Sequence, residues 1–166
     1  EAYHFVRDYN KKLKEGQEPF KVIYGTELTM IDDTIKIVIR PTNQHLLTTT
    51  FVVFDTETTG FNAGGSDSMI EIGAVKICGG EIVDRFDELI NPNKKLNPKI
   101  TELTNITDQM LEDKESEEVV VKKFMEWVGD LPMVAHNAKF DISFLEMAFK
   151  KYNLGDYTNA VIDTLE

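Results

Sequence analysis

The most constraining feature of the sequence is an apolar run that ends in two carboxylates. Residues 50–54 read Thr-Phe-Val-Val-Phe, and Asp55-Thr56-Glu57 follows directly. A short run of aromatic and β-branched residues favours a buried strand. Side chains two positions apart on a strand share a face, so the two carboxylates would crowd one spot and repel each other. Divalent cations with oxygen ligands relieve such crowding. The pair therefore predicts a metal site, with a solvated acidic turn as the alternative.

The pattern after this run predicts an α/β domain. Strands are expected over residues 69–77 and 81–90, joined by a Gly79-Gly80 turn, so that the first three strands form an antiparallel meander. Helix starts are expected at Asn97-Pro98, Thr107 and Ser116. A short strand over 131–135, a helix over 140–152 and a strand from residue 161 follow. Together these elements predict a mixed five-stranded sheet with flanking helices.

The first 47 residues differ from the rest in charge. They hold seven basic and seven acidic side chains, whereas residues 48–166 hold 11 basic and 22 acidic ones and carry the whole net charge of −11. A helix is expected around residues 6–13, with β-rich stretches at 20–24 and 34–40. So small an α+β fragment buries little core. We therefore place a domain boundary near residue 47 and expect the first segment to belong to a larger domain.

Composition narrows the possible functions. A net charge of −11 argues against nucleic-acid binding through a broad basic surface, but it is compatible with carboxylates that act through bound metal ions. No apolar run is as long as a membrane span, and the first residues do not read as a secretory signal. The single cysteine, Cys78, argues against a disulfide framework. A reducing, cytoplasmic setting is expected.

A second polar cluster lies between the short strand and the helix that follows it. Residues 136–141 read His-Asn-Ala-Lys-Phe-Asp, which places Asp141 in the first helical turn. A carboxylate at that position also stabilises the helix dipole, so a purely structural aspartate is the alternative. The end of a central strand and the start of a later helix are where open sheets gather ligands, which favours a shared site with Asp55 and Glu57.

These motifs resemble those of the DEDD exonucleases. Residues 54–60, Phe-Asp-Thr-Glu-Thr-Thr-Gly, resemble the first motif of that family, and residues 136–141 resemble the second. Residues 100–108 are similar to the segment between the motifs, and Ile-Asp-Thr-Leu at 162–165 to the strand after the second-motif helix. The resemblance runs from about residue 49 to the last residue and implies a ribonuclease H-like exonuclease fold.

The N-terminal segment carries a further resemblance. Residues 1–4 and 21–27 are similar to the segment that precedes the exonuclease in PolC-type replicative DNA polymerases of bacteria. In that family the exonuclease is inserted in a PHP (polymerase and histidinol phosphatase-like) domain. The resemblance implies that residues 1–47 are part of a PHP domain and residues 48–166 a C-terminally truncated exonuclease domain of the histidine subtype.

The resemblance also implies site roles. Asp55, Glu57 and Asp141 would ligate two Mg²⁺ or Mn²⁺ ions, of which one activates the attacking water and the other stabilises the leaving 3′ oxygen. Thr58 would help to hold the 3′ nucleotide, and weaker candidates for the pocket of the terminal base are Phe61, Ile106 and Asn137. The histidine subtype also needs a late general base and a fourth carboxylate, which lie beyond the residues matched here. We therefore expect the chain alone to be a weak or inactive nuclease.

The function implied is 3′–5′ proofreading in bacterial DNA replication. The substrate would be a single-stranded 3′ end of DNA, and the partners would be the rest of the polymerase chain and, through it, a sliding clamp. Two alternatives stay open at this point. One is an RNA or oligonucleotide exonuclease of the same superfamily, and the other is a catalytically silent scaffold that binds polymerase partners.

Overall fold

The computed structural model describes residues 2–19, 37–45 and 47–165, which fall into two compact units, residues 1–33 and 34–166. In the first unit, helix α1 (Ala2–Asn10) confirms the expected N-terminal helix. The β-rich stretch expected at 20–24 and the family resemblance at 21–27 lie outside the described residues. The assignment of residues 1–47 to a PHP domain therefore stays a prediction.

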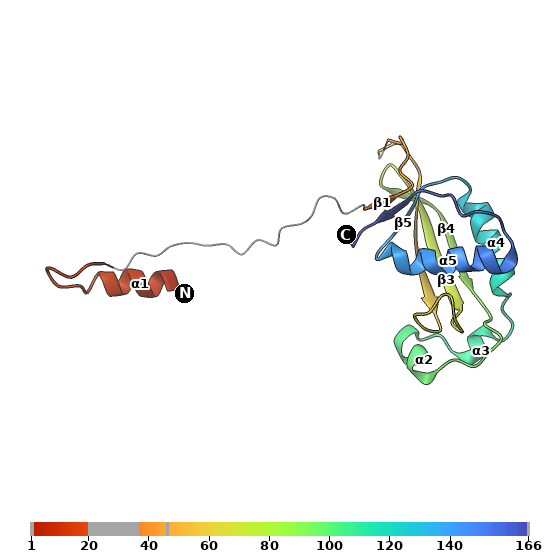
Figure 1. Cartoon of the computed structure of the whole chain (residues 1–166), viewed down its shortest axis with the longest axis horizontal. Coiled ribbons are helices and arrows are strands. Elements are labelled where there is room, and N and C mark those ends of the chain that lie inside the picture. Colours follow the sequence, from red (N-terminus) through yellow and green to blue (C-terminus); the bar gives the residue numbers. More distant parts are fainter. Residues whose placement is uncertain (1, 20–36, 46, 166) are drawn as a thin grey trace. The chain divides into compact units, whose positions relative to one another are not determined.

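The second unit is built on one mixed sheet of six strands (Figure 1). The strand order is β1-β6-β5-β2-β3-β4. Strands β2 (Phe51–Thr58), β3 (Met69–Cys78) and β4 (Glu81–Leu89) form the predicted antiparallel meander. Strands β5 (Met133–Ala135) and β6 (Val161–Asp163) add to it in parallel. The α/β class and the mixed sheet are confirmed.

The sheet has one strand more than the five expected from the sequence. Strand β1 (Val38–Ile39) pairs antiparallel with β6, with Val38 opposite Ile162. These two residues belong to the stretch that the sequence placed in the N-terminal fragment, ahead of the boundary near residue 47. Local periodicity predicts that a strand forms, but it does not say which strand will pair with it, because pairing is a long-range choice.

The described residues of the second unit also form four helices: α2 (Pro98–Thr104), α3 (Asp108–Leu111), α4 (Glu117–Val128) and α5 (Ala138–Tyr152). The expected caps are present for the first two. The Asn97 side chain accepts a hydrogen bond from the backbone N–H of Lys99, and the Thr107 side chain accepts one from that of Met110. Helix α5 starts two residues earlier than expected, because Asn137 turns the chain at a φ of 59°.

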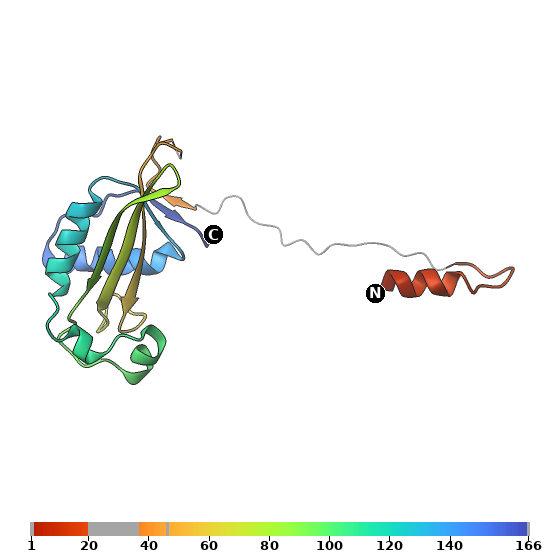
Figure 2. The same cartoon turned by 180° about the vertical axis from the view of Figure 1, so that it is seen from behind.

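Helices α4 and α5 cover one face of the sheet. On β2, Val52 and Phe54 point to that face, and the Phe54 ring lies 5.9 Å from the ring of Phe124 on α4. Within the described part of the chain, no helix covers the other face, which Figure 2 shows from behind. Alternation along β2 therefore places Asp55 and Glu57 on this more open face. None of the described helices is long and apolar enough to cross a membrane.

Candidate active site

Strand β2 carries the first two carboxylates of the site. Asp55 is exposed and Glu57 is half-buried, on the same face. In the register of β2 and β3, Asp55 lies opposite Gly73, which has no side chain, and Glu57 lies opposite Glu71. The space around Asp55 is thus open, whereas Glu57 faces a further carboxylate that the sequence analysis did not single out.

Helix α5 brings the third carboxylate to the same strand. Asp141 is only 1% exposed, and its Oδ1 accepts hydrogen bonds from both the backbone N–H and the hydroxyl of Thr56, at 3.0 and 2.6 Å. Thr56 points to the helix-covered face of the sheet, between the two acidic residues of β2. The two acidic motifs are therefore joined directly, 85 residues apart in sequence.

The carboxylates perturb one another. The pKa of Asp141 is raised to about 6: burial is the largest cause, the hydrogen bonds from Thr56 offset part of its effect, and the charge of Asp55 adds to the rise. Burial also raises the pKa of Glu57, and the charges of Asp55, Glu71 and Asp141 add to this effect. Arg40, Lys122, Lys123 and Lys151 form their ion pairs with other carboxylates. The site thus concentrates negative charge.

Such a site suits a divalent cation in its donor chemistry. Carboxylate oxygens are the ligands that Mg²⁺ and Mn²⁺ prefer, and a cation would remove the repulsion that raises the pKa of Glu57. The geometry of the described residues does not form a closed metal site. In the residues that the structure describes, no three His, Cys, Asp or Glu side chains converge closely enough to hold a metal ion. The assignment of Asp55, Glu57 and Asp141 as metal ligands stays a prediction.

The four candidate substrate residues lie in different surroundings. Phe61 is 87% exposed, in the loop that follows β2, and its ring lies 6.0 Å from that of Phe140 on α5. Thr58 is buried, and its hydroxyl donates to the carbonyl oxygen of Gly60 at 2.6 Å. Asn137 is exposed at the start of α5, whereas Ile106 is only 3% exposed, in a small apolar cluster. Phe61 and Asn137 are thus accessible to a ligand, and the roles of all four stay predictions.

Two aspartates that the sequence did not assign to the site hold the segments next to it by hydrogen bonds. Asp163 of β6 accepts hydrogen bonds from the backbone N–H groups of Asn137 and Leu165, both at 3.0 Å, and so fixes the turn that starts α5. Asp67 accepts from the hydroxyl of Thr59 and the backbone N–H of Asn62, which closes the loop after β2. Motif spacing gave no signal for these contacts, because most of their donors are backbone N–H groups, which any residue supplies.

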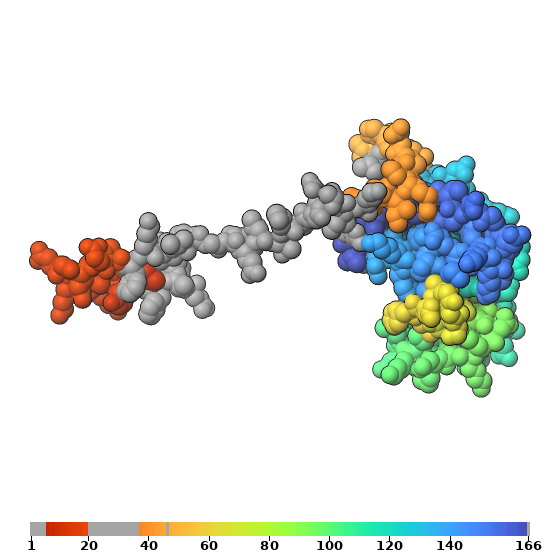
Figure 3. Space-filling model, viewed as in Figure 1, coloured from red at the N-terminus to blue at the C-terminus, as the bar shows by residue number. Residues whose placement is uncertain are grey.

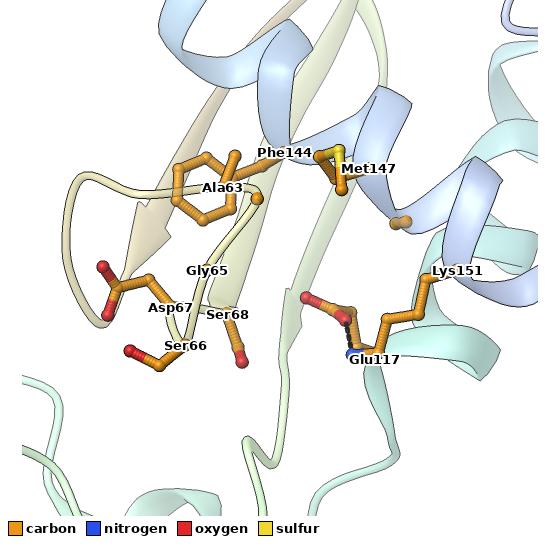
Figure 4. A pocket seen from close by; sticks show the side chains of 11 residues that line it. Ala63, Gly65, Ser66, Asp67, Ser68, Glu117, Phe144, Met147 and Lys151 are labelled. Atoms are coloured by element: carbon orange, nitrogen blue, oxygen red, sulfur yellow. Dashed lines mark hydrogen bonds and ion pairs between the residues drawn. The ribbon is translucent and has the colours of Figure 1, made fainter.

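A hollow of about 350 Å³ lies beside this loop, against α5 (Figure 4). Its buried carboxylate, Glu117, accepts hydrogen bonds from the backbone N–H of Met69, from Lys151 at 2.8 Å and from the hydroxyl of Tyr152 at 2.7 Å. Because its oxygens are already occupied, Glu117 serves to connect α4, α5 and β3. It does not belong to the carboxylate site.

Comparison with known proteins identifies the class. The model of the protein family described as "Exonuclease" matches residues 52–166, and the chain belongs to that family. Solved structures agree in fold: apo exonuclease I superposes with a TM-score of 0.61 at 18% identity, over 70% of this chain and 29% of that one. A metal-free complex of Escherichia coli exonuclease I with single-stranded DNA gives 0.63 at 18% identity, over 71% and 28%. The expected exonuclease fold is confirmed.

Curated relatives narrow the class further. The chain is 47% identical over 165 residues to the DNA polymerase III PolC-type of Bacillus cereus, which covers 99% of this chain and 11% of that protein. The PolC-type polymerase of Staphylococcus aureus is 46% identical over 146 residues, or 88% and 10%. The resemblance to PolC-type polymerases is thus confirmed, and the chain spans about one tenth of the length of these relatives.

Proposed function

We propose that this chain is the 3′–5′ proofreading exonuclease region of a bacterial replicative DNA polymerase and hydrolyses the terminal phosphodiester of DNA. The observation that carries the proposal is the hydrogen-bonded junction of Asp141 with Thr56. It brings a buried carboxylate to the strand that bears Asp55 and Glu57, in a chain of the exonuclease family.

In this proposal, Asp55, Glu57 and Asp141 hold Mg²⁺ or Mn²⁺, two ions in all. Bound there, the ions would supply Lewis-acid chemistry, which lowers the pKa of a water and neutralises charge on the phosphate. The chain itself fixes the carboxylates. Thr56 holds Asp141 by two hydrogen bonds, and the pleat of β2 keeps Asp55 and Glu57 on one face. Exposed Phe61 offers a ring on which the terminal base stacks.

The substrate and partners follow from the relatives. DNA with a single-stranded 3′ end is favoured over RNA, because the similar proteins are DNA polymerases. The remainder of such a polymerase chain is the first partner, and a sliding clamp reached through it is the second. A replicative polymerase of bacteria works on DNA in the cytoplasm. We therefore include the cytoplasmic setting expected from the sequence in this proposal.

Two measurements on matched variants test the proposal. Titration with Mn²⁺ is expected to show binding to the wild type and much weaker binding to Asp55→Ala. The matched control is Glu81→Ala, which removes an exposed carboxylate at the far end of β4 and is expected to bind as the wild type does. With 3′-labelled single-stranded DNA and Mn²⁺, a slow loss of terminal nucleotides is expected from the wild type and from Glu81→Ala only.

Each alternative predicts a different result. A silent scaffold would release no nucleotide, whatever the metal. An RNA exonuclease would degrade a 3′-labelled RNA of the same sequence faster than the DNA. Cleavage that survives Asp55→Ala at the wild-type rate would refute the metal-site assignment.

A further inference from the structure

Three lysines form a concentrated positive patch on this acidic protein. Lys94, Lys95 and Lys99 lie in the stretch 91–101, which contains no Asp or Glu, although the whole chain carries a net charge of −11. All three are exposed, and in the described part of the chain none forms an ion pair. By contrast, Lys122 and Lys151 are each paired with a glutamate. The charge of the patch is therefore available to a ligand.

The backbone beneath this patch is firmly held. Leu96, between the lysines, is buried, and its N–H donates to the Asp108 carboxylate at 2.8 Å. Asn97 caps α2, and the side chain of Asn91 donates to the carbonyl oxygen of Glu112 at 3.0 Å. The lysine stems thus project from a fixed segment, which lowers the cost of ordering them on a ligand.

Contacts lead from the patch to the carboxylate site. The ammonium of Lys94 donates to the carbonyl oxygen of Ser66, in the loop that follows β2. The same loop carries the exposed ring of Phe61, which packs near Phe140, the residue before Asp141. In Figure 3 this loop, in yellow, lies between the blue of α5 and the green of the segment that includes α2. The loop after β2 therefore connects the patch, through Phe61 and Phe140, to the helix that carries Asp141.

We propose that Lys94, Lys95 and Lys99 bind the backbone phosphates of the single strand whose 3′ end enters the carboxylate site. This inference rests on the proposed function and names the path that the substrate takes. Proteins that bind single strands combine positive side chains along the backbone with aromatic rings under the bases. The patch and Phe61 supply both, on a chain whose net charge is −11.

A binding experiment tests the path without requiring cleavage. It uses a labelled single-stranded DNA of about 16 nucleotides, and fluorescence anisotropy measures its affinity in EDTA over a range of salt concentrations. The double variant Lys95→Gln/Lys99→Gln removes two charges and leaves the Lys94–Ser66 contact intact. Each phosphate contact contributes about 0.7 to the slope of log affinity against log salt for single strands. The expected result is a slope shallower by about 1.4 and an affinity about tenfold lower at low salt.

The matched control is Lys114→Gln/Lys150→Gln, which removes two other exposed lysines that form no ion pair with any residue that the structure describes. This control changes the net charge by the same amount but leaves the lysine patch intact. It is therefore expected to bind DNA as the wild type does. Phe61→Ala should weaken binding about tenfold without changing the slope, since stacking is not ionic. Equal losses in the two double variants, or no binding by the wild type, would overturn the proposed path.

The outcome separates this path from the proposed function. If Asp55-dependent cleavage is seen but the lysine variants bind and cleave like the wild type, the path is wrong and the function stands. If binding depends on Lys95 and Lys99 but no condition gives cleavage, the path stands and the nuclease activity does not.

Discussion

Replacing Asp141 with asparagine should stabilise the protein when metal is absent. Asparagine keeps an oxygen that can accept from the backbone N–H and the hydroxyl of Thr56, at 3.0 and 2.6 Å, and removes only the charge. The pKa of Asp141 rises from its ordinary value of 3.8 to about 6. Each unit is worth about 1.4 kcal/mol, so the ionised side chain costs the fold at most roughly 3 kcal/mol at neutral pH. Because the amide must also be buried, we expect a gain of about 1–3 kcal/mol.

The same shift fixes the sign of the pH dependence. The folded state binds the Asp141 proton more tightly than the unfolded state does, so between about pH 4 and pH 6 the folded state holds more protons. The stability of the wild type should therefore fall as pH rises through this window, and the full penalty should remain above about pH 6. Asp141→Asn should show a flatter profile, because its side chain does not titrate.

Thermal unfolding in EDTA, at several pH values across this window, measures both effects. A gain of 1–3 kcal/mol corresponds to a melting temperature about 3–10 °C higher for a domain of this size. Asp156→Asn, at an exposed position, is the control and should melt as the wild type does. Adding Mn²⁺ should raise the melting temperature of the wild type more than that of Asp141→Asn. A variant that melts below the wild type at neutral pH in EDTA would refute the reasoning.

Three further substitutions test contacts around the site. Glu71→Gln should raise metal-free stability by a few tenths of a kcal/mol to about 1 kcal/mol, because Glu71 faces another carboxylate across the strands; thermal unfolding in EDTA measures this. Glu117→Ala should cost about 1–3 kcal/mol in urea unfolding, because the buried N–H of Met69 loses its acceptor, whereas Glu118→Ala next to it should cost far less. Gly60→Ala should destabilise by about 1–3 kcal/mol, since a Cβ there would collide with the Asp67 carboxylate that closes the loop; faster amide exchange at Asn62 would report it.

The sequence predicted local elements well because their signals are local. Alternation of apolar residues, the Gly79-Gly80 turn and the caps at Asn97 and Thr107 act within a few residues, and each appears in the structure where it was expected. The pairing of β1 with β6 was not predicted, since it joins residues more than 120 positions apart. Local signals do not encode which distant strand will supply the partner.

In the candidate site, too, local sequence signals identified some residues, whereas residues placed by long-range pairing were missed. Asp55, Glu57 and Asp141 were found from spacing and from a family resemblance, and the structure brings their motifs together. Glu71 was missed, because its place opposite Glu57 depends on the register of two strands. Asp163 was not assigned to the site, and its hydrogen bonds from two backbone N–H groups fix the turn that starts α5, the helix that carries Asp141.

The pleat of β2 explains why this site combines open and buried carboxylates. Successive side chains alternate, so Asp55 and Glu57 face the open side of the sheet while Thr56 between them faces the helices. Thr56 can therefore hold Asp141 from below without competing for the space in front of the other two carboxylates. Moving the acidic residues to adjacent positions would place one of them against the core, where its charge would be desolvated. A spacing of two, with a hydroxyl between, lets one strand end both anchor a buried aspartate and present two carboxylates on the open face of the sheet.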